Sequence, residues 1–196
     1  MKKIAVLVSG SGTNMQNIAE YFNKGDYARV TIVLSNNPDA YAIERAKKLD
    51  VPCVVFNKED FYDTDKILDL LIEEEVDIVV LAGFLWLIPL KFIIVFPFEI
   101  INIHPALLPN YGGKGMYGMK VHEAIIAAKE KQSGITIHYV NERYDEGSII
   151  FQAFCDIVPE DTADDLAHKI HNLEQIYFPG IIDHVLKFEG DTPVRL

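Results

Sequence analysis

Hydrophobic and polar positions follow two alternating patterns along the first two thirds of the chain. Short apolar runs rich in valine and isoleucine, typical of strands buried on both faces, alternate with stretches of helical periodicity. The predicted strands are 3–8, 29–34, 53–56, 77–82 and 99–103, and the predicted helices are 14–23, 40–49, 62–75 and 120–131. Strands that alternate with helices imply parallel crossovers, so the fold class is α/β.

The pattern changes after residue 134. Two apolar runs, 135–140 and 148–158, flank a polar connection of hairpin length, which predicts an antiparallel pair. Residues 161–165 offer capping side chains and first-turn acids for a closing helix that runs toward Tyr177, and 181–188 predicts a further helix after Pro179-Gly180. We therefore expect a doubly wound, mostly parallel sheet with an antiparallel edge, in a single domain spanning 1–196.

Composition narrows the possible partners. The chain of 196 residues is 49% hydrophobic, enough for one sizeable core. Its 29 acidic and 18 basic residues give a net charge of −11, which argues against nucleic acid as a partner but allows a small phosphorylated ligand. We expect small-molecule substrates, and a monomer or a homodimer.

Neither of the most apolar segments resembles a membrane element. The run after Lys2-Lys3 holds only five apolar residues before Ser9, which predicts a strand rather than a secretory signal. The stretch 81–98 is interrupted by Pro89, Lys91 and Pro97, as expected of a buried strand and a short helix. We therefore expect a cytoplasmic protein without a membrane span.

A glycine-rich loop follows the first predicted strand. Backbone amides and the helix dipole at such a position can hold an anion. A dinucleotide fingerprint would need a third glycine where Met15 stands and an acid after the second strand, where 35–37 reads Ser-Asn-Asn; the Walker lysine is missing as well. The loop therefore predicts a site for one terminal phosphate, with a tight turn as the alternative. Its candidate residues are Gly10, Ser11, Gly12, Thr13 and Asn14.

Candidate chemistry lies at the end of the fifth predicted strand. Period-two alternation puts Asn102 and His104 on one side, and Asp145 stands in a turn-forming stretch that could orient the imidazole. An amide and an imidazole suit a developing oxyanion, and a nearby carboxylate would raise the pKa of His104 and set its tautomer. No serine or cysteine adjoins the pair, so direct attack by an amine or water is expected. The alternative is an ordinary strand end and turn.

Four motifs together resemble the folate-dependent formyltransferases, particularly those that formylate glycinamide ribonucleotide in purine biosynthesis. They are the runs 9–14 (SGSGTN), 80–84 (VLAGF), 102–109 (NIHPALLP) and 144–147 (YDEG). The resemblance implies a Rossmann-like formyltransferase that transfers the formyl group of 10-formyltetrahydrofolate, its co-substrate. It implies a catalytic trio of Asn102, His104 and Asp145; a ribonucleotide site formed by Gly10, Ser11, Gly12, Thr13, Asn14, His171 and Glu174; and a folate site formed by Leu85, Trp86, Leu87, Ile88, Asn102, Asn141, Glu142, Arg143 and Tyr144.

Departures and alternatives accompany that resemblance. The segment 57–63 offers only Lys58, and Trp86 stands where relatives carry an arginine, so recognition of the folate glutamate is expected to differ. Rival functions are a formyltetrahydrofolate hydrolase, a sugar-amine formyltransferase and a non-catalytic nucleotide-binding module.

No cysteine or histidine spacing predicts a metal site. We expect His138 to have a structural or supporting role, and His122 and His184 to lie on helix surfaces.

Overall fold

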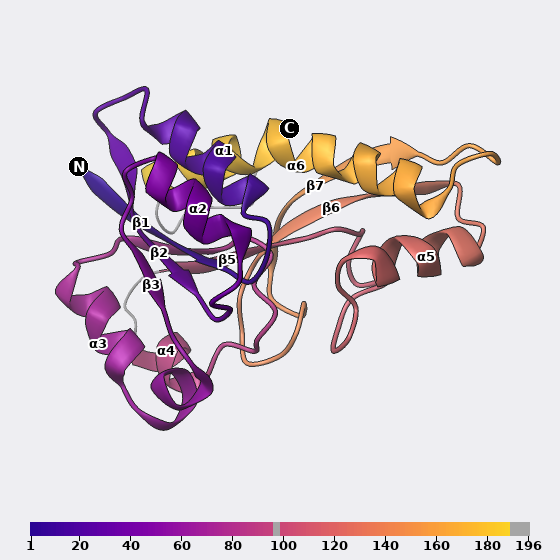
Figure 1. Ribbon diagram of the computed structural model, residues 1–196. Coiled ribbons are helices and arrows are strands. Elements are labelled where there is room, and N and C mark those ends of the chain that lie inside the picture. Colours follow the sequence, from indigo (N-terminus) through magenta and orange to yellow (C-terminus); the bar gives the residue numbers. More distant parts are fainter. Residues whose placement is uncertain (96–98, 189–196) are drawn as a thin grey trace. The chain divides into compact units, whose positions relative to one another are not determined.

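We describe the protein from a computed structural model, which covers residues 1–95 and 99–188 (Figure 1). Contacts along the chain divide it into two compact units, Met1–Asn102 and Ile103–Leu196. The expectation of a single domain over 1–196 stays a prediction.

The first unit is built on parallel strands. Its strands are β1 (Lys2–Val8), β2 (Ala28–Ser35), β3 (Cys53–Val55), β4 (Ile78–Leu81) and β5 (Glu99–His104), and β5 ends in the second unit. β1 pairs in parallel with both β2 and β4, β3 with β2, and β5 with β4. Every residue of β4 is buried, as expected of a strand covered on both faces. All five predicted strands are confirmed, with bounds that differ by one residue.

The helices of the first unit are α1 (Thr13–Phe22), α2 (Tyr41–Lys48), α3 (Lys66–Glu73) and α4 (Leu90–Val95). The predicted helix 62–75 begins too early, because a separate π-helical turn, η1 (Glu59–Asp63), precedes α3. Phe61 in this turn is fully buried, and its ring lies 5.0 Å from that of Phe92. The packing of this aromatic ring therefore gives the backbone a separate turn here, although the sequence pattern predicts a continuous helix.

The second unit contains β6 (Gln132–Tyr139), β7 (Ile149–Asp156), α5 (Met119–Ala127) and α6 (Ala163–Lys187). The two strands are antiparallel, and α6 contacts both (Figure 1). β6 begins before the predicted residue 135 and includes Gly134, where a Cβ atom would lie 1.9 Å from the Ala153 carbonyl oxygen. The glycine thus allows close approach of β7, whereas the sequence suggested a loop that followed a helix reaching 131.

The predicted break at Pro179-Gly180 is wrong, because α6 is continuous through Pro179. Phe178, Pro179, Ile181 and Ile182 are all buried, so packing of this face offsets the missing proline N–H. At the other end of α6, Thr162 and Asp165 form a reciprocal capping box, in the segment where capping residues were predicted.

The strand order is β3-β2-β1-β4-β5-β6-β7. The pairs from β3 to β5 are parallel, and the final pair, β6 and β7, is antiparallel. The predicted α/β class, with a mostly parallel sheet and an antiparallel edge, is confirmed. Among the described residues, no helix is both long enough and apolar enough to cross a membrane.

Candidate active site

β5 carries two of the predicted catalytic residues. Asn102 and His104 are two positions apart in this strand, and Asn102 is in register with Leu81 of β4. His104 is the last residue of β5 and is only 3% exposed. The strand therefore delivers the imidazole into a buried environment at its carboxyl end.

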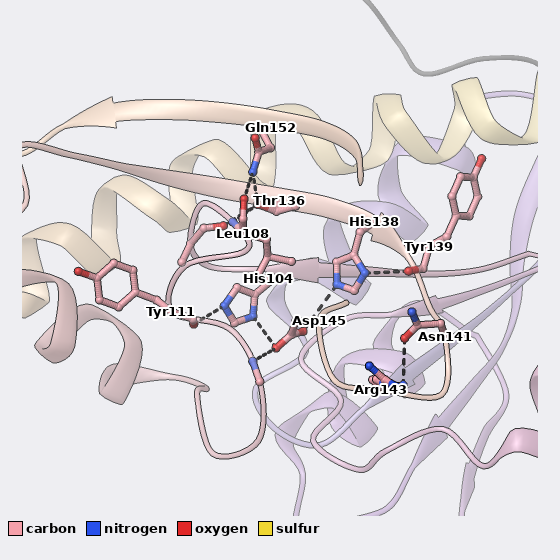
Figure 2. Close-up of polar contacts among 12 residues, drawn as sticks. His104, Leu108, Tyr111, Thr136, His138, Tyr139, Asn141, Arg143, Asp145 and Gln152 are labelled. Carbon is pink, nitrogen blue, oxygen red and sulfur yellow. Dashed lines mark hydrogen bonds and ion pairs between the residues drawn. The ribbon is translucent and has the colours of Figure 1, made fainter. Parts of the chain in front are cut away.

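His104 lies between two oxygen atoms of the second unit (Figure 2). Its Nε2 is 2.8 Å from the carbonyl oxygen of Tyr111, and its Nδ1 is 3.5 Å from Oδ2 of Asp145. Because a carbonyl oxygen can only accept, Nε2 carries a proton. Nδ1 is thus the nitrogen whose protonation can change, and it faces the carboxylate. The two side chains thus lie beside each other, and their catalytic role stays a prediction.

Asp145 raises the pKa of His104, as predicted, but the net shift of this pKa is downward. Burial lowers this pKa, and the Asp145 carboxylate and the Tyr111 carbonyl, which both raise it, do not compensate. The sequence motif indicates a nearby carboxylate, whereas the desolvation of the His104 ring depends on tertiary packing. The result is an imidazole that is predominantly neutral at pH 7, able to accept a proton at Nδ1 beside an anion.

Asp145 is held by groups on both sides of its carboxylate. Oδ2 accepts from the Gly113 amide at 2.9 Å, and Oδ1 is 3.6 Å from Nε2 of His138. Burial would raise the pKa of Asp145, but the hydrogen bond from His138, the charge of His104 and the Gly113 amide together lower it. Asp145 is therefore ionised at neutral pH. Its backbone φ of 58° is left-handed, a conformation that Asp tolerates better than most residues.

The glycine-rich loop connects β1 to α1 in the first unit. α1 begins at Thr13, and Gly12 precedes it in a left-handed conformation with φ of 74° and without a side-chain cap. The carbonyl groups of Ser9, Gly10 and Ser11 each accept a hydrogen bond from the segment 37–45. The donors are, in order, Asn37 Nδ2 at 3.2 Å, the Ala42 amide at 3.1 Å and Arg45 Nε at 2.9 Å.

These bonds orient the loop amides. In a trans peptide, the N–H of one residue points opposite to the C=O of the residue before it. With the three carbonyl groups directed at the segment 37–45, the amides of Gly10, Ser11 and Gly12 point away from it. Consecutive amides that converge at the start of a helix suit an anion. The geometry is therefore compatible with the predicted phosphate site.

The late-helix residues His171 and Glu174 form an ion pair in α6, with Nδ1 and Oε2 separated by 3.5 Å. This contact raises the pKa of His171. The charge of the Glu174 carboxylate also raises the pKa values of His104 and His122, against the lowering by burial. The structure thus links a predicted substrate residue electrostatically to His104.

Comparisons with known proteins identify the family. A model of the formyl transferase family matches residues 2–182. The chain belongs to the formyl transferase family.

The chain is similar to two curated relatives and to one solved structure, as follows. It is 40% identical to a chloroplastic phosphoribosylglycinamide formyltransferase of Arabidopsis thaliana, over 97% of this chain and 68% of the relative. It is 40% identical to the phosphoribosylglycinamide formyltransferase of Haemophilus influenzae, over 93% of this chain and 86% of the relative. Glycinamide ribonucleotide transformylase 1 from Symbiobacterium toebii superposes with a TM-score of 0.86 at 33% identity, covering 97% and 92% of the two chains.

The predicted folate residues of this formyltransferase fall into both units. In the first, Leu85 is exposed and Trp86 is half-buried, whereas Ile88 is buried, which favours a core role for Ile88. Trp86 borders a pocket of about 430 Å³, and the Lys58 ammonium lies 5.9 Å from its ring centre. The other lining residues are Asn36, Pro38, Val55, Phe56, Asn57 and Asp60.

The remaining folate candidates form the turn after β6. Asn141 accepts a hydrogen bond from the Arg143 amide at 2.9 Å, and the Arg143 guanidinium pairs with Glu146 at 3.1 Å. Glu142 and Arg143 are exposed, while Asn141 and Tyr144 are half-buried. This turn leads directly into Asp145, so its conformation governs the position of the Asp145 carboxylate.

Sequence reasoning missed several members of the site. Tyr111 and Gly113 act through backbone atoms, which leave no trace in side-chain chemistry. His122, expected on a helix surface, is only 6% exposed; its spacing from Ile125 on the buried face of α5 was the available indication. His138 was expected to be structural or supporting, and only the folded turn brings it beside Asp145.

Proposed function

We propose that this formyltransferase transfers the formyl group of 10-formyltetrahydrofolate to the amine of glycinamide ribonucleotide. The proposal rests on one combined observation. A buried His104–Asp145 pair, with 3.5 Å between Nδ1 and Oδ2, occurs in a chain 40% identical to enzymes named phosphoribosylglycinamide formyltransferase.

The reaction proceeds by direct attack. The amine nitrogen forms a bond to the formyl carbon, and the carbonyl oxygen becomes an oxyanion to which the Asn102 amide donates, an interaction worth ~3 kcal/mol in a preorganised site. The intermediate collapses by breaking the bond to N10 of the folate, and the proton lost by the amine reaches N10. Proton movement between two such nitrogens suits a neutral imidazole paired with an ionised carboxylate.

His104 serves this proton movement through a defined nitrogen. Nδ1 faces Asp145, which stabilises the imidazolium that forms when a proton is taken up. Nε2–H donates to the Tyr111 carbonyl, so donation to the substrate oxygen requires that this bond be exchanged. The Tyr111 carbonyl thereby holds the imidazole in one tautomer until the substrate replaces it.

Substrate binding divides between the predicted segments. The amides of Gly10 to Gly12, with Thr13 and Asn14 at the start of α1, bind the ribonucleotide phosphate. The Glu174 carboxylate accepts from the ribose hydroxyls, with His171 beside it. Leu85, Trp86 and Leu87 contact the folate together with Asn141 to Tyr144, while Ile88 packs in the core. Trp86 and Lys58 stand where relatives carry arginines. A cytoplasmic location, a monomer or homodimer and the lack of a metal stay predictions.

Omission assays test the reaction. Tetrahydrofolate formation is measured with both substrates and with each omitted, and we expect it to require glycinamide ribonucleotide. An equal rate without the amine would identify a hydrolase. Turnover only with an amino sugar nucleotide would identify a sugar-amine formyltransferase, and ribonucleotide binding without turnover would identify a binding module.

The role of Asp145 is tested by Asp145→Asn, which keeps the side-chain shape and tolerates the left-handed backbone. We expect kcat to fall by about 10²- to 10⁴-fold, the range for a positioned proton-transfer group, because the imidazolium loses its anionic partner. Asp26→Asn, at an exposed site, is the matched control and should retain wild-type turnover. Wild-type turnover in Asp145→Asn would refute the proton-transfer role.

A further inference from the structure

His138 is a buried imidazole that the steps above do not use. It lies in β6, is 2% exposed, and its Nε2 faces Oδ1 of Asp145 at 3.6 Å (Figure 2). We propose that His138 is a positioning residue for Asp145, holding the carboxylate so that its other oxygen addresses His104. This inference rests on the proposed function, because it concerns how that reaction's carboxylate is held.

The two ring nitrogens of His138 contact different groups. Its Nδ1 is 2.8 Å from the Tyr139 carbonyl oxygen, which can only accept, so Nδ1 is a donor. Nε2 faces Oδ1 of the Asp145 carboxylate at 3.6 Å. The ring is therefore anchored through Nδ1 to the backbone of its own strand, while its other nitrogen is directed at the carboxylate. The strand thereby fixes the direction of the second nitrogen.

Asp145 has a separate partner for each oxygen. Oδ1 faces His138, while Oδ2 faces Nδ1 of His104 and accepts from the Gly113 amide. A carboxylate contacted on one oxygen only can turn about its side-chain bonds. With both oxygens engaged, the plane of the carboxylate is set, and Oδ2 is kept opposite the nitrogen of His104 whose protonation changes.

The backbone brings these groups together at an irregularity of the hairpin. The register between β6 and β7 shifts between Ile137 and His138, so that Ile150 is the additional residue in β7. Such bulges redirect neighbouring side chains. Gly147 closes the turn, since a Cβ there would lie 1.7 Å from the Tyr139 carbonyl oxygen. The turn can therefore fold back far enough for Asp145 to reach His138.

Two substitutions separate the two polar contacts of His138, with the Tyr139 carbonyl and with Asp145. The amide nitrogen of His138→Asn occupies roughly the place of Nδ1 and can still reach the Tyr139 carbonyl, but not Asp145. The longer His138→Gln places its amide nitrogen near Nε2 and can donate to Asp145. The pair distinguishes a role through Asp145 from a role in holding the strand.

We expect His138→Asn to lower kcat by about 10- to 100-fold with both KM values within about threefold of wild type, because a displacement of roughly 1 Å at a reacting group costs on this order. His138→Gln should recover most of kcat. His168→Asn and His168→Gln, at an exposed histidine, are the matched controls, and thermal unfolding verifies that every variant folds. A kcat for His138→Gln equal to or below that of His138→Asn overturns the proposal.

A double-mutant comparison tests whether His138 acts through Asp145. Adding His138→Asn to Asp145→Asn should change kcat by no more than about twofold, since residues that act as a unit are not additive. A further loss equal to that of the single variant overturns the proposal.

One spectroscopic measurement is independent of activity. In ¹⁵N NMR of the imidazoles, Asp145→Asn should move the His138 Nε2 resonance, and an unchanged resonance overturns the proposal. If the wild-type chain shows no ribonucleotide-dependent turnover, the proposed function fails, and this measurement still decides whether His138 and Asp145 are paired.

Discussion

A Cβ atom on Gly12 would lie 2.6 Å from the Cβ of Ala42 and 2.7 Å from its Cα. Gly12 also has a left-handed φ of 74°, so the position is restricted both by space and by backbone conformation. Because the neighbouring atoms include backbone, α2 or the loop must move to accept any side chain here.

Gly12→Ala should therefore damage the loop more than the fold. We expect the KM for glycinamide ribonucleotide to rise by about tenfold or more, since misplaced amides lose the phosphate, while the KM for the folate changes by less than about threefold. Unfolding should be easier by about 1–3 kcal/mol. Steady-state kinetics and denaturant unfolding measure both, with Gly25→Ala, where nothing lies within 4 Å, as control. Equal losses for both substrates would refute the phosphate assignment.

Arg45 supports the same loop, through Nε to the Ser11 carbonyl and through its guanidinium to Gln16. We expect Arg45→Lys, which keeps the charge but cannot reproduce both bonds, to raise the KM for the ribonucleotide by about three- to tenfold with kcat nearly unchanged. Lys48→Gln, an exposed position of the same helix, controls for charge. If Arg45→Lys binds the ribonucleotide as wild type does, Arg45 contributes charge alone.

Stability should fall as the solution is acidified from pH 8 to pH 5. Burial lowers the pKa values of His104 and His122, so these groups bind protons more readily in the unfolded state than in the folded one. Their contribution is complete above the unfolded value of about 6.5 and is lost as pH falls toward the folded pKa. Each contributes at most about 1.4 kcal/mol per pH unit.

Two variants test the sign of this dependence in urea unfolding at several pH values. His122→Leu should flatten the curve, because it removes one such group. His171→Asn should steepen it, because the raised pKa of His171, due to Glu174, stabilises the fold below pH 6.5 and opposes the trend. Changes of the opposite sign would show that burial does not control His122.

Thr136 anchors the segment that follows His104. Its buried hydroxyl donates to the Ala106 carbonyl at 2.7 Å and accepts from the Leu108 amide at 3.0 Å. Thr136→Val should destabilise by about 2–3 kcal/mol, because buried backbone groups lose their partners. The matched control is Thr31→Val: the Thr31 hydroxyl is buried and has no hydrogen-bond partner among the described residues, so valine should be neutral or stabilising. Urea unfolding of both variants makes the comparison.

Local interactions account for the success of the sequence-based predictions. Strands β1 to β5 are visible because parallel strands buried on both faces demand continuous apolar runs, and the cap of α6 because Thr162 and Asp165 bond within one turn. The glycine loop was recognisable because Gly12 must adopt a positive φ. Each of these features depends on residues close together in the chain.

Errors occurred wherever distant packing prevailed over local preference. α6 continues through Pro179 because its neighbours are buried, and His122 lies inward because α5 packs there. Distant packing also gives the pKa of His104 a net downward shift, since desolvation depends on everything that surrounds the ring, although Asp145 raises this pKa as predicted.

By itself, therefore, the sequence determined the α/β fold class and the resemblance to formyltransferases, and it predicted Asn102, His104 and Asp145 as a catalytic group. Only the tertiary structure decided the orientation, the protonation and the hydrogen-bond partners of these side chains. It set which nitrogen of His104 faces Asp145, it supplied the Tyr111 carbonyl and the Gly113 amide, and it brought His138 to the other carboxylate oxygen. The physical reason is that motifs specify side-chain types, whereas protonation and orientation depend on burial and on backbone atoms far apart in the chain.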